Sequence, residues 1–346
     1  PWSDYSHNGG VDVVSGGTVT TRKPVLLQKD HAITGLDDGT YFVLHRDYRK
    51  SLIMYAATNG AASSYRYRIL HDFATSPKAI ERNDTGNTLF VTVDSDAKIY
   101  RFKTTGTPGP TSVWTMDTIT GLTSPSGMSY DKVGDHLYVV DGSSIKRISG
   151  ATATPAVDAA WGSVAAAGAT DVAFANNASH ANKLFVAFQS RQEVRAFPVS
   201  APPATTLLTD AAYAYVSGLD IDPQAILAHP TNGQVYVRAS NYSRSYTIST
   251  AKVVSFQHNY TGHHILRAFG ITPDGSSVRA DNHYGRVHGK AFLTGLLQSH
   301  EVAAHGDWIY VGSHMAHEYV GLHAMNIADG SDMFIPGFEV PTSSRH

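Results

Sequence analysis

Apolar and polar positions along this chain follow a short pattern that recurs at a nearly constant spacing. Each copy has a turn, a short apolar strand, a second turn of Gly, Asn or Asp, and then a strand of the type apolar–aromatic–valine. The six copies of this second strand are Tyr41-Phe42-Val43, Leu89-Phe90-Val91, Leu137-Tyr138-Val139, Leu184-Phe185-Val186, Val235-Tyr236-Val237 and Ile309-Tyr310-Val311. Their central residues lie 47 to 51 residues apart, except for a last interval of 74. A period of this length accommodates four strands with their turns, which is typical of a β-propeller blade.

Further strands with alternating apolar residues follow the second strands, and this alternation is typical of half-buried strands. Third strands are expected at 98–102, 144–148 and 193–197, and fourth strands at 67–70, 112–116 and 265–269. The pattern predicts an all-β fold in which residues 1–346 form a single six-bladed β-propeller of four-stranded blades. Seven blades are the alternative.

Both ends of the chain carry a candidate for the strand that completes the last blade. Residues 18–27 lead into Asp30-His31-Ala32-Ile33 and resemble a fourth strand that enters a first strand. We expect this N-terminal strand to close the ring, because closure removes sheet edges that would otherwise be exposed. The alternative is Met333-Phe334-Ile335-Pro336, within the last blade itself.

The repeat resembles the NHL and YVTN groups of β-propellers. The segments that carry the resemblance are Asp135-His136-Leu137-Tyr138-Val139-Val140-Asp141 and Lys183-Leu184-Phe185-Val186. The resemblance implies the architecture alone, because such propellers include lactonases, lyases, lectins and scaffolds.

The single long interval marks an extra segment of the chain at 272–297. This segment is interpreted as an insertion that covers one face of the propeller, or as a degenerate extra blade. Long loops that leave a rigid repeat scaffold often carry binding or catalytic residues. We therefore expect functional residues here.

Composition excludes several classes of function. Charged residues make up 16% of the chain, and the net charge is −2 with neutral histidine. A nucleic acid or an anionic membrane surface is therefore not an expected partner. The chain has no cysteine, which excludes disulfides and thiolate chemistry. No apolar run approaches the roughly 20 residues of a membrane span, so membrane insertion is not expected.

Four N-x-S/T sequons favour a secreted, extracellular glycoprotein over a cytosolic protein. They begin at Asn83, Asn177, Asn241 and Asn259, each in a predicted turn or loop between strands. The alternative is that these are chance sequons in a bacterial protein.

The first strand of each blade starts at the mouth of the central channel, so polar residues there are expected to converge. By the repeat alignment these starts are Asp30-His31, Pro77-Lys78, Ser126-Gly127, Thr170-Asp171, Ser217-Gly218 and Ser299-His300-Glu301. Such a set can bind a divalent metal ion, or a small-molecule or glycan ligand, through Asp30, Lys78, Asp171, His300 and Glu301. The alternative is a hydrated polar channel without function.

Residues of the extra segment supply the groups that a polysaccharide lyase needs. His283, Tyr284, Arg286 and His288 offer a base, a phenol and a guanidinium, and His31 joins them as a further candidate. The stretch from Asp30 to His45 also resembles the Asp-His-Asn…Asp-Gly…His pattern of propeller-type polysaccharide lyases, with Ala32 in place of Asn. This resemblance implies catalysis by His, Tyr and Arg. The alternative is a polar, solvated loop.

A third candidate site is His314-Met315-Ala316-His317-Glu318, in which His314 and His317 can ligate a metal. The segment lies between the second and third strands of a blade and does not match the helical zinc-protease motif. The alternative is ordinary polarity of a loop.

Three functions follow from these patterns. The first is a secreted propeller lyase or hydrolase that acts on a carbohydrate or lactone at the channel mouth. The second is a non-enzymatic extracellular glycoprotein that binds a ligand or self-assembles into a homo-oligomer. The third is a metalloenzyme whose metal is held by histidines.

Overall fold

The structure is a computed structural model, and it describes residues 8–15, 18–26, 31–35, 41–45, 50–57, 65–93, 95–109, 111–204, 206–219, 222–229, 233–239, 244–259, 266–271, 277–281, 284–287, 292–294, 299–305, 308–313, 321–326 and 332–336. Side chains are described for Phe42, Leu44, residues 50–54 and, between 68 and 254, the described residues other than 238–239 and 244–245. The chain divides into two compact units. The first holds residues Pro1–Ser76, Thr105–Val113 and His264–His346, and the second holds Pro77–Thr104 and Trp114–His263.

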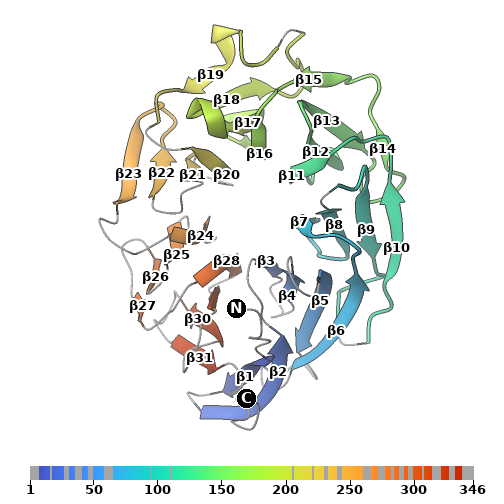
Figure 1. Cartoon of the computed structure of the whole chain (residues 1–346), viewed down its shortest axis with the longest axis vertical. Helices are drawn as coiled ribbons and strands as arrows, with labels where there is room; N and C mark the ends of the chain where they lie inside the picture. The colour runs from blue at the N-terminus through green and yellow to red at the C-terminus, as the bar shows by residue number, and fades with distance from the viewer. Residues whose placement is uncertain are drawn as a thin grey trace, which may run out of the picture. The chain divides into compact units, whose positions relative to one another are not determined.

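The second unit contains four antiparallel sheets, in which the strands follow one another in chain order except that β14 and β15 both pair with β13 (Figure 1). The first two sheets are β7 (Pro77–Arg82), β8 (Thr88–Val93), β9 (Ile99–Lys103) and β10 (Thr115–Ile119), and β11 (Pro125–Asp131), β12 (His136–Asp141), β13 (Ser144–Ser149), β14 (Ala156–Val157) and β15 (Ser163–Ala165). The other two are β16 (Ala169–Asn177), β17 (His180–Phe188), β18 (Glu193–Pro198) and β19 (Ala214–Val216), and β20 (Pro223–Ala228), β21 (Val235–Ala239), β22 (Arg244–Ile248) and β23 (Val254–Asn259). Two short 3₁₀ helices lie in this unit, η1 (Gln189–Arg191) and η2 (Ala211–Tyr213).

The first unit contains, among its described residues, three four-stranded sheets and one hairpin. The hairpin is β1 (Asn8–Ser15) and β2 (Thr18–Leu26), and the sheet that follows it is β3 (His31–Gly35), β4 (Tyr41–His45), β5 (Ser51–Ala57) and β6 (Tyr65–Asp72). The remaining sheets are β24 (Leu266–Ile271), β25 (Ser277–Asp281), β26 (Tyr284–Val287) and β27 (Phe292–Thr294), and β28 (Ser299–His305), β29 (Trp308–Ser313), β30 (Gly321–Asn326) and β31 (Asp332–Pro336).

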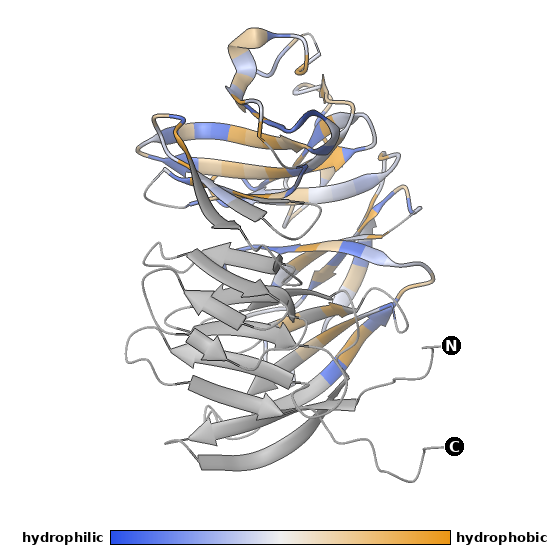
Figure 2. Cartoon of the chain, turned by 60° about the vertical axis from the view of Figure 1, so that its left-hand side comes forward, coloured by the Kyte–Doolittle hydropathy of each residue, from blue (hydrophilic) through white to orange (hydrophobic). Residues whose placement is uncertain are grey.

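Burial of both sheet faces explains the apolar–aromatic–valine pattern of the second strands. On β12, Leu137 and Val139 pack into one cluster with Phe90 of the preceding sheet. Tyr138 points to the opposite face, where it packs into another cluster with Leu184 of the following sheet. Successive side chains of a strand point to opposite faces, so a strand between two neighbouring sheets needs apolar residues at every position. Figure 2 shows hydrophobic and hydrophilic bands along the described strands of this unit.

The first strands of the four sheets in the second unit lie side by side in the order β7, β11, β16 and β20 (Figure 1). Side chains join them to their neighbours. The Thr92 hydroxyl donates to the Ser126 carbonyl at 3.0 Å, and the Thr170 hydroxyl donates to the Pro223 carbonyl at 3.1 Å. These bonds fix the register between sheets, because sheets of a propeller share no backbone ladder.

A β-bulge lies near the start of each of these first strands, where the regular pairing with the second strand is interrupted. The bulges fall between Pro77 and Ala79, Pro125 and Met128, Ala169 and Asp171, and Pro223 and Ala225. In the first unit, β24 and β28 have the same feature. A bulge inserts an extra residue into one strand. The side chain of that residue does not follow the regular alternation between the two faces of the sheet.

One predicted start of a first strand, Ser217-Gly218, is wrong. Ser217-Gly218 follows β19, whereas the first strand of the next sheet begins at Pro223. The equivalent bulged residue is therefore Gln224.

The segment 272–297 forms strands rather than one irregular loop. It contains β25, β26 and β27, which pair with β24 in a four-stranded sheet. The predicted fourth strand at 265–269 consequently overlaps β24, the first strand of this sheet. The number of blades in the ring stays a prediction.

The last sheet takes its fourth strand from the C-terminal end of the chain. β30 pairs with β31, and β2 pairs with β1 in a separate hairpin. The alternative around Met333 thus supplies the fourth strand of this sheet, and closure of the ring by residues 18–27 stays a prediction. β31 follows β30 directly in the chain, so the two strands pair by closing only a short loop. Pairing of β30 with β2 would close a loop of most of the chain, which costs more conformational entropy.

Candidate functional site

The predicted site residues fall into three groups with respect to the structure. Lys78, Asn83, Asp171 and Asn177 are described with their side chains; Lys78 lies on β7, Asn83 directly after β7, and Asp171 and Asn177 on β16. Backbone alone is described for His31 on β3, Tyr284 and Arg286 on β26, His300 and Glu301 on β28, and Asn259 on β23. The others lie outside the described residues: Asp30, His283, His288, His314, His317 and Asn241.

Within the first unit, the structure brings two of the predicted first strands together. β28, which carries His300 and Glu301, lies beside β3, which begins at His31. Tyr284 and Arg286 lie two residues apart on β26, so the segment that carries them is a strand and not the predicted loop.

The described part of the candidate site lies on the first strands of the second unit, and its most perturbed group is Glu81. Burial raises the pKa of this carboxyl from 4.5 to about 7, and the negative charges of Asp171 and Asp84 act in the same direction. The backbone N–H and the guanidinium of Arg82 act against this increase without cancelling it. A carboxyl group with this pKa can bind and release a proton near neutral pH.

Asp171 is held rigidly at the neighbouring bulge. Its Oδ2 accepts a hydrogen bond from the backbone N–H of Ile226 on β20 at 3.0 Å, and its Oδ1 accepts one from Val172 at 2.9 Å. Two backbone donors favour the ionised form of a carboxylate. Asp171 therefore links β16 to β20 and places a fixed acceptor close to Glu81.

Gly127 provides the space that Asp171 occupies. A Cβ atom on Gly127 would lie 2.3 Å from Asp171 Oδ1 and 2.7 Å from its Cα. Any other residue at this position of β11 would thus displace the carboxylate. The bulge at 126–127 and the absence of a side chain bring β16 close to β11.

Two further polar groups lie at the bulges of the same strands. Lys78 is partly buried on β7, and Gln224 is partly buried on β20. The side-chain oxygen of Gln224 is buried and has no hydrogen-bond partner among the described residues. We call these four residues of the first strands, Lys78, Glu81, Asp171 and Gln224, the inner-strand cluster; within it, the charge of Asp171 acts on Glu81.

The inner-strand cluster combines a proton-exchanging carboxyl, a fixed carboxylate, a cation and an amide. This set can move a proton and stabilise charge, which are the requirements of elimination and of hydrolysis. Glu81 and Gln224 were missed in the sequence. A repeat alignment could have found Gln224, but a lone glutamate in Pro77–Arg82 carries no pattern that marks it.

A metal site is not formed by the side chains that the structure describes. They include no group of three or more His, Asp or Glu residues arranged to hold a metal ion. Metal binding by His314 and His317, and a divalent metal in the central channel, stay predictions.

Both described sequons hold their asparagine in turn hydrogen bonds. Nδ2 of Asn83 donates to the Thr85 hydroxyl at 3.1 Å and to Asn87 at 2.8 Å, and Nδ2 of Asn177 donates to the His229 carbonyl at 2.9 Å. A glycan replaces one hydrogen of Nδ2, so modification of Asn83 would remove one of these two bonds.

Comparison with known proteins identifies the fold. No family model and no curated relative matches the chain. The virginiamycin B lyase from Staphylococcus aureus aligns over 82% of this chain and 91% of its own, with a TM-score of 0.60 and 10% identity. A catalytically inactive variant of that lyase with quinupristin gives 0.59, at 11% identity over 83% and 94%. The WD40 β-propeller domain of Doa1 gives 0.57, at 11% identity over 90% and 94%.

The chain is a β-propeller. The resemblance of its repeat to propeller blades is confirmed, since structural neighbours from unrelated propeller proteins cover most of its length. Identities of 10–11% carry the fold alone, so no residue of these neighbours is assigned to this propeller. None of the helices that the structure describes has the length and apolar character needed to span a membrane.

Proposed function

We propose that this propeller is a secreted lyase or hydrolase that acts on a carbohydrate or lactone, with the inner-strand cluster supplying the proton transfer. The observation that carries the proposal is that burial and the charge of Asp171, which the backbone N–H groups of Val172 and Ile226 hold in place, raise the pKa of Glu81 on β7. A carboxyl that titrates near neutral pH beside a fixed carboxylate is a common arrangement in acid–base catalysis.

Each residue has a role in this proposal. Glu81 in its ionised form removes a proton from the substrate, and Lys78 stabilises the negative charge that develops. Burial, with a smaller contribution from the charge of Asp171, keeps the pKa of Glu81 high, so that Glu81 is a base strong enough to take the proton. His31, Tyr284, Arg286 and His300 of the first unit, together with His283 and His288, stay proposed site residues in their own right.

The fold is one support for an enzyme of this kind. Structural neighbours include a lyase, so a propeller with this strand arrangement is compatible with elimination chemistry. We also propose seven blades, because the two units together hold seven sheets of at least four strands among the described residues. Secretion is proposed from the four sequons.

The test is a substrate screen with the full chain. We would use uronate polysaccharides, neutral polysaccharides, sugar lactones and quinupristin, and follow the ultraviolet absorbance of unsaturated products and the release of acid. For any substrate that turns over, we expect kcat/KM to rise with pH and to level off above about 7, because ionised Glu81 is required.

A variant and a matched control separate catalysis from stability. Glu81→Gln is expected to lower kcat/KM by about 100-fold or more, since general base catalysis contributes that much. Glu193→Gln alters another buried glutamate, which pairs with Arg195 on β18 at 3.1 Å, and should reduce stability while leaving turnover unchanged. Full activity of Glu81→Gln, or no turnover of any substrate class, would contradict the proposal.

A further inference from the structure

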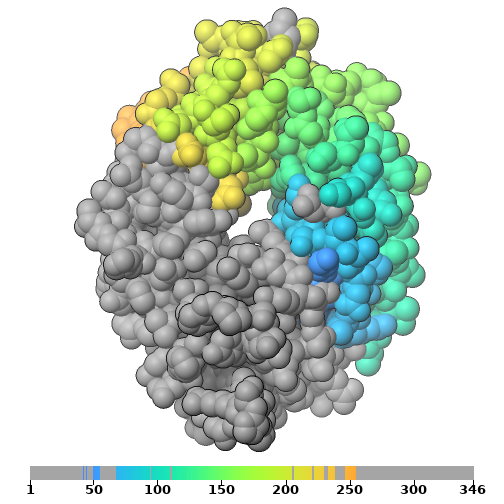
Figure 3. Space-filling model, viewed as in Figure 1, coloured from blue at the N-terminus to red at the C-terminus, as the bar shows by residue number. Residues whose placement is uncertain are grey.

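The second unit has an open groove of about 530 Å³ that belongs to neither the inner-strand cluster nor the sheet cores. One wall is formed by the turn before β13 and by β15, and the other by the long segment between β18 and β19. Figure 3 shows the described surface of this unit, coloured cyan through yellow. The volume is in the range of natural ligand-binding sites.

The lining of the groove is polar but uncharged. Three of its eight lining residues are alanine or proline. The other five carry a hydroxyl group: Ser143, Ser144, Ser163, Thr206 and Thr209. Ser144 donates to the Asp141 carbonyl and Thr209 to the Thr206 carbonyl. The hydroxyls of Ser143, Ser163 and Thr206 have no partner among the described residues, so they are available to a ligand.

The edge of β15 in this groove has backbone groups that are not paired within the sheet. β15 pairs with β13 only, with Ser144 opposite Ala165 and Lys146 opposite Ser163. The Ala166 N–H donates to the Ser143 carbonyl, so the next residue along β15, Ala165, directs its backbone groups away from β13. Alternation then directs the backbone N–H and carbonyl of Ser163 to the same outer edge.

The chain itself already uses this edge once. The backbone N–H of Leu207, which lies in a turn, donates to the Ala165 carbonyl at 2.9 Å. The side chains of Ser163 and Ala165 are exposed, whereas Val164 between them is buried in the core. Leu207 occupies the Ala165 carbonyl, so Ser163 is the position on this edge whose outward backbone groups are open to strand-type hydrogen bonds.

We propose that this groove binds an extended, uncharged peptide segment of a partner protein, which adds to the outer edge of β15. Backbone bonds to Ser163 provide affinity, and the free hydroxyls select small or hydroxyl-bearing side chains. A charged segment is disfavoured, because the lining has no charged side chain to compensate the desolvation of its charges. A sugar is disfavoured, because no aromatic ring lines the groove to stack on it.

The test measures binding of synthetic, end-blocked hexapeptides to the full chain by titration calorimetry. One peptide pool lacks Asp, Glu, Lys and Arg, a second contains them, and a neutral glucose hexasaccharide serves as the third probe. We expect the uncharged pool to contain binders and the other two probes to bind at least tenfold more weakly. Stronger binding of the hexasaccharide, or no binding of any peptide, would overturn the proposal.

Variants of the edge locate the binding. Ser163→Pro removes the outward N–H, at an edge position where proline does not break the ladder with β13, and should weaken peptide binding at least tenfold. Ser163→Ala keeps the backbone and should change affinity by less than about threefold, since backbone bonds dominate strand addition. Ala204→Trp fills the groove from an exposed position and should also abolish binding, with Val133→Trp on an exposed turn as its control.

Unchanged affinity in both Ser163→Pro and Ala204→Trp would exclude the groove as the binding site. The result does not depend on the proposed enzymatic function. Glu81→Gln, which should abolish catalysis, is expected to leave peptide affinity unchanged.

Discussion

The carboxylate of Asp171 occupies the space that a side chain on Gly127 would fill, with Oδ1 only 2.3 Å from the position of a Cβ atom. Gly127 lies on the first strand of one sheet and Asp171 on the first strand of the next. The small residue on β11 therefore determines where the acid on β16 can lie, and Asp171 in turn raises the pKa of Glu81 on β7.

Gly127→Ala should consequently destabilise the protein and lower the pKa of Glu81. The added methyl group forces Asp171 away from its two backbone donors, and overpacking of this kind costs about 1–3 kcal/mol. Because Asp171 contributes to the raised pKa of Glu81, that pKa should fall. The measurements are urea denaturation and titration of the Glu81 carboxyl by NMR.

A matched control for this variant is Gly109→Ala. A Cβ atom there would meet only the Ser112 hydroxyl, at 3.9 Å. The free energy of unfolding should change by less than about 0.5 kcal/mol, as for an ordinary surface substitution. Equal effects of the two substitutions would show that the contact with Asp171 is unimportant.

The contribution of Glu81 to the free energy of unfolding should fall as the pH rises from about 4.5 to about 7. Its folded pKa is raised, so the folded state retains a proton that the unfolded state has lost in this window. Stability from this group is complete below pH 4.5 and is lost as the pH passes 7, by at most about 3 kcal/mol.

The difference between wild type and Glu81→Gln isolates this effect from other titrating groups. We expect Glu81→Gln to gain stability relative to wild type between pH 4.5 and 8, as measured by urea denaturation at both values. A difference that stays constant over this range would mean that the pKa of Glu81 is not raised in the folded state.

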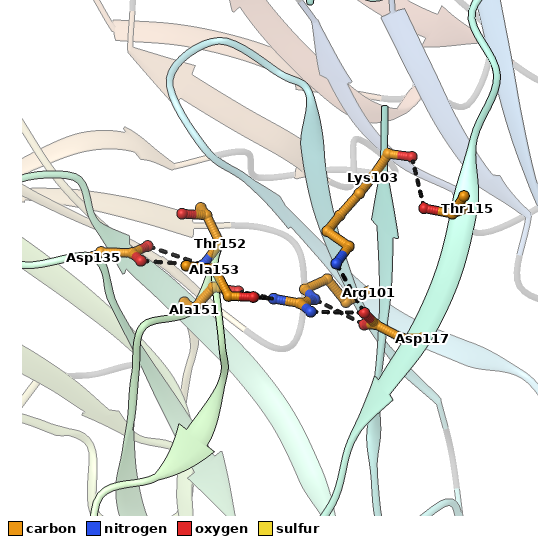
Figure 4. A network of polar contacts seen from close by, with 8 residues as sticks. All are labelled: Arg101, Lys103, Thr115, Asp117, Asp135, Ala151, Thr152 and Ala153. Carbon is orange, nitrogen blue, oxygen red and sulfur yellow. Dashed lines mark hydrogen bonds and ion pairs between the residues drawn. The ribbon is translucent and has the colours of Figure 1, made fainter. Parts of the chain in front are cut away.

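Arg101, whose own side chain is buried, joins two sheets through a network of polar contacts that Figure 4 shows. Its guanidinium binds both carboxylate oxygens of Asp117, at 2.8 and 2.6 Å. It also donates to the carbonyls of Ala151 and Ala153 in the next sheet, at 2.9 and 3.1 Å. The side chain of Arg101 is 4% exposed.

Arg101→Ala should therefore cost about 1–3 kcal/mol in the free energy of unfolding, because it leaves the buried carbonyl of Ala151 without a donor. Lys103 also binds Asp117, at 3.0 Å, but its side chain is 34% exposed. Lys103→Ala should cost less than about 1 kcal/mol, as is usual for exposed pairs. Denaturation curves of both variants provide the comparison, and similar losses would contradict the role assigned to Arg101.

The strands were predictable where the repeat pattern has a direct physical cause. Sheets buried on both faces need apolar residues at successive positions, so segments such as Leu137-Tyr138-Val139 identify second strands from the sequence alone. The sheet of β24–β27 was missed as a regular blade, since its second strand reads Ser-Val-Arg-Ala-Asp and has no aromatic residue. An alternation this short cannot be distinguished from a loop.

The site was less predictable than the fold, because its properties arise from contacts between distant parts of the chain. Asp171 was predicted from the alignment of strand starts. Glu81 was not, since its high pKa depends on burial against other strands and on the charge of Asp171. The unsatisfied oxygen of Gln224 and the space above Gly127 likewise exist only in the folded chain.

Asp141 forms a buried clamp at the end of β12, and its environment predicts how the protein responds to acid. Its side chain is fully buried and accepts bonds from the backbone N–H groups of Thr123 and Ser124, at 2.7 and 2.6 Å. Lys146 lies 2.7 Å from the carboxylate. Burial alone would raise the pKa of Asp141, but the hydrogen bonds from Lys146, Ser124 and Thr123 outweigh it and lower the pKa below 3.8.

Because this folded pKa is lowered, the stability that Asp141 provides is present above pH 3.8 and is lost as the pH falls towards the folded pKa. Lys146→Ala removes one partner of the buried carboxylate and should cost about 3 kcal/mol at pH 7. It should also move the midpoint of acid unfolding to higher pH. The control is Lys132→Ala, which breaks the exposed pair with Asp84 at 3.2 Å and should cost less than about 1 kcal/mol. Acid titrations followed by circular dichroism measure both midpoints, and an unchanged midpoint in Lys146→Ala would show that Thr123 and Ser124 suffice to hold the ionised carboxylate.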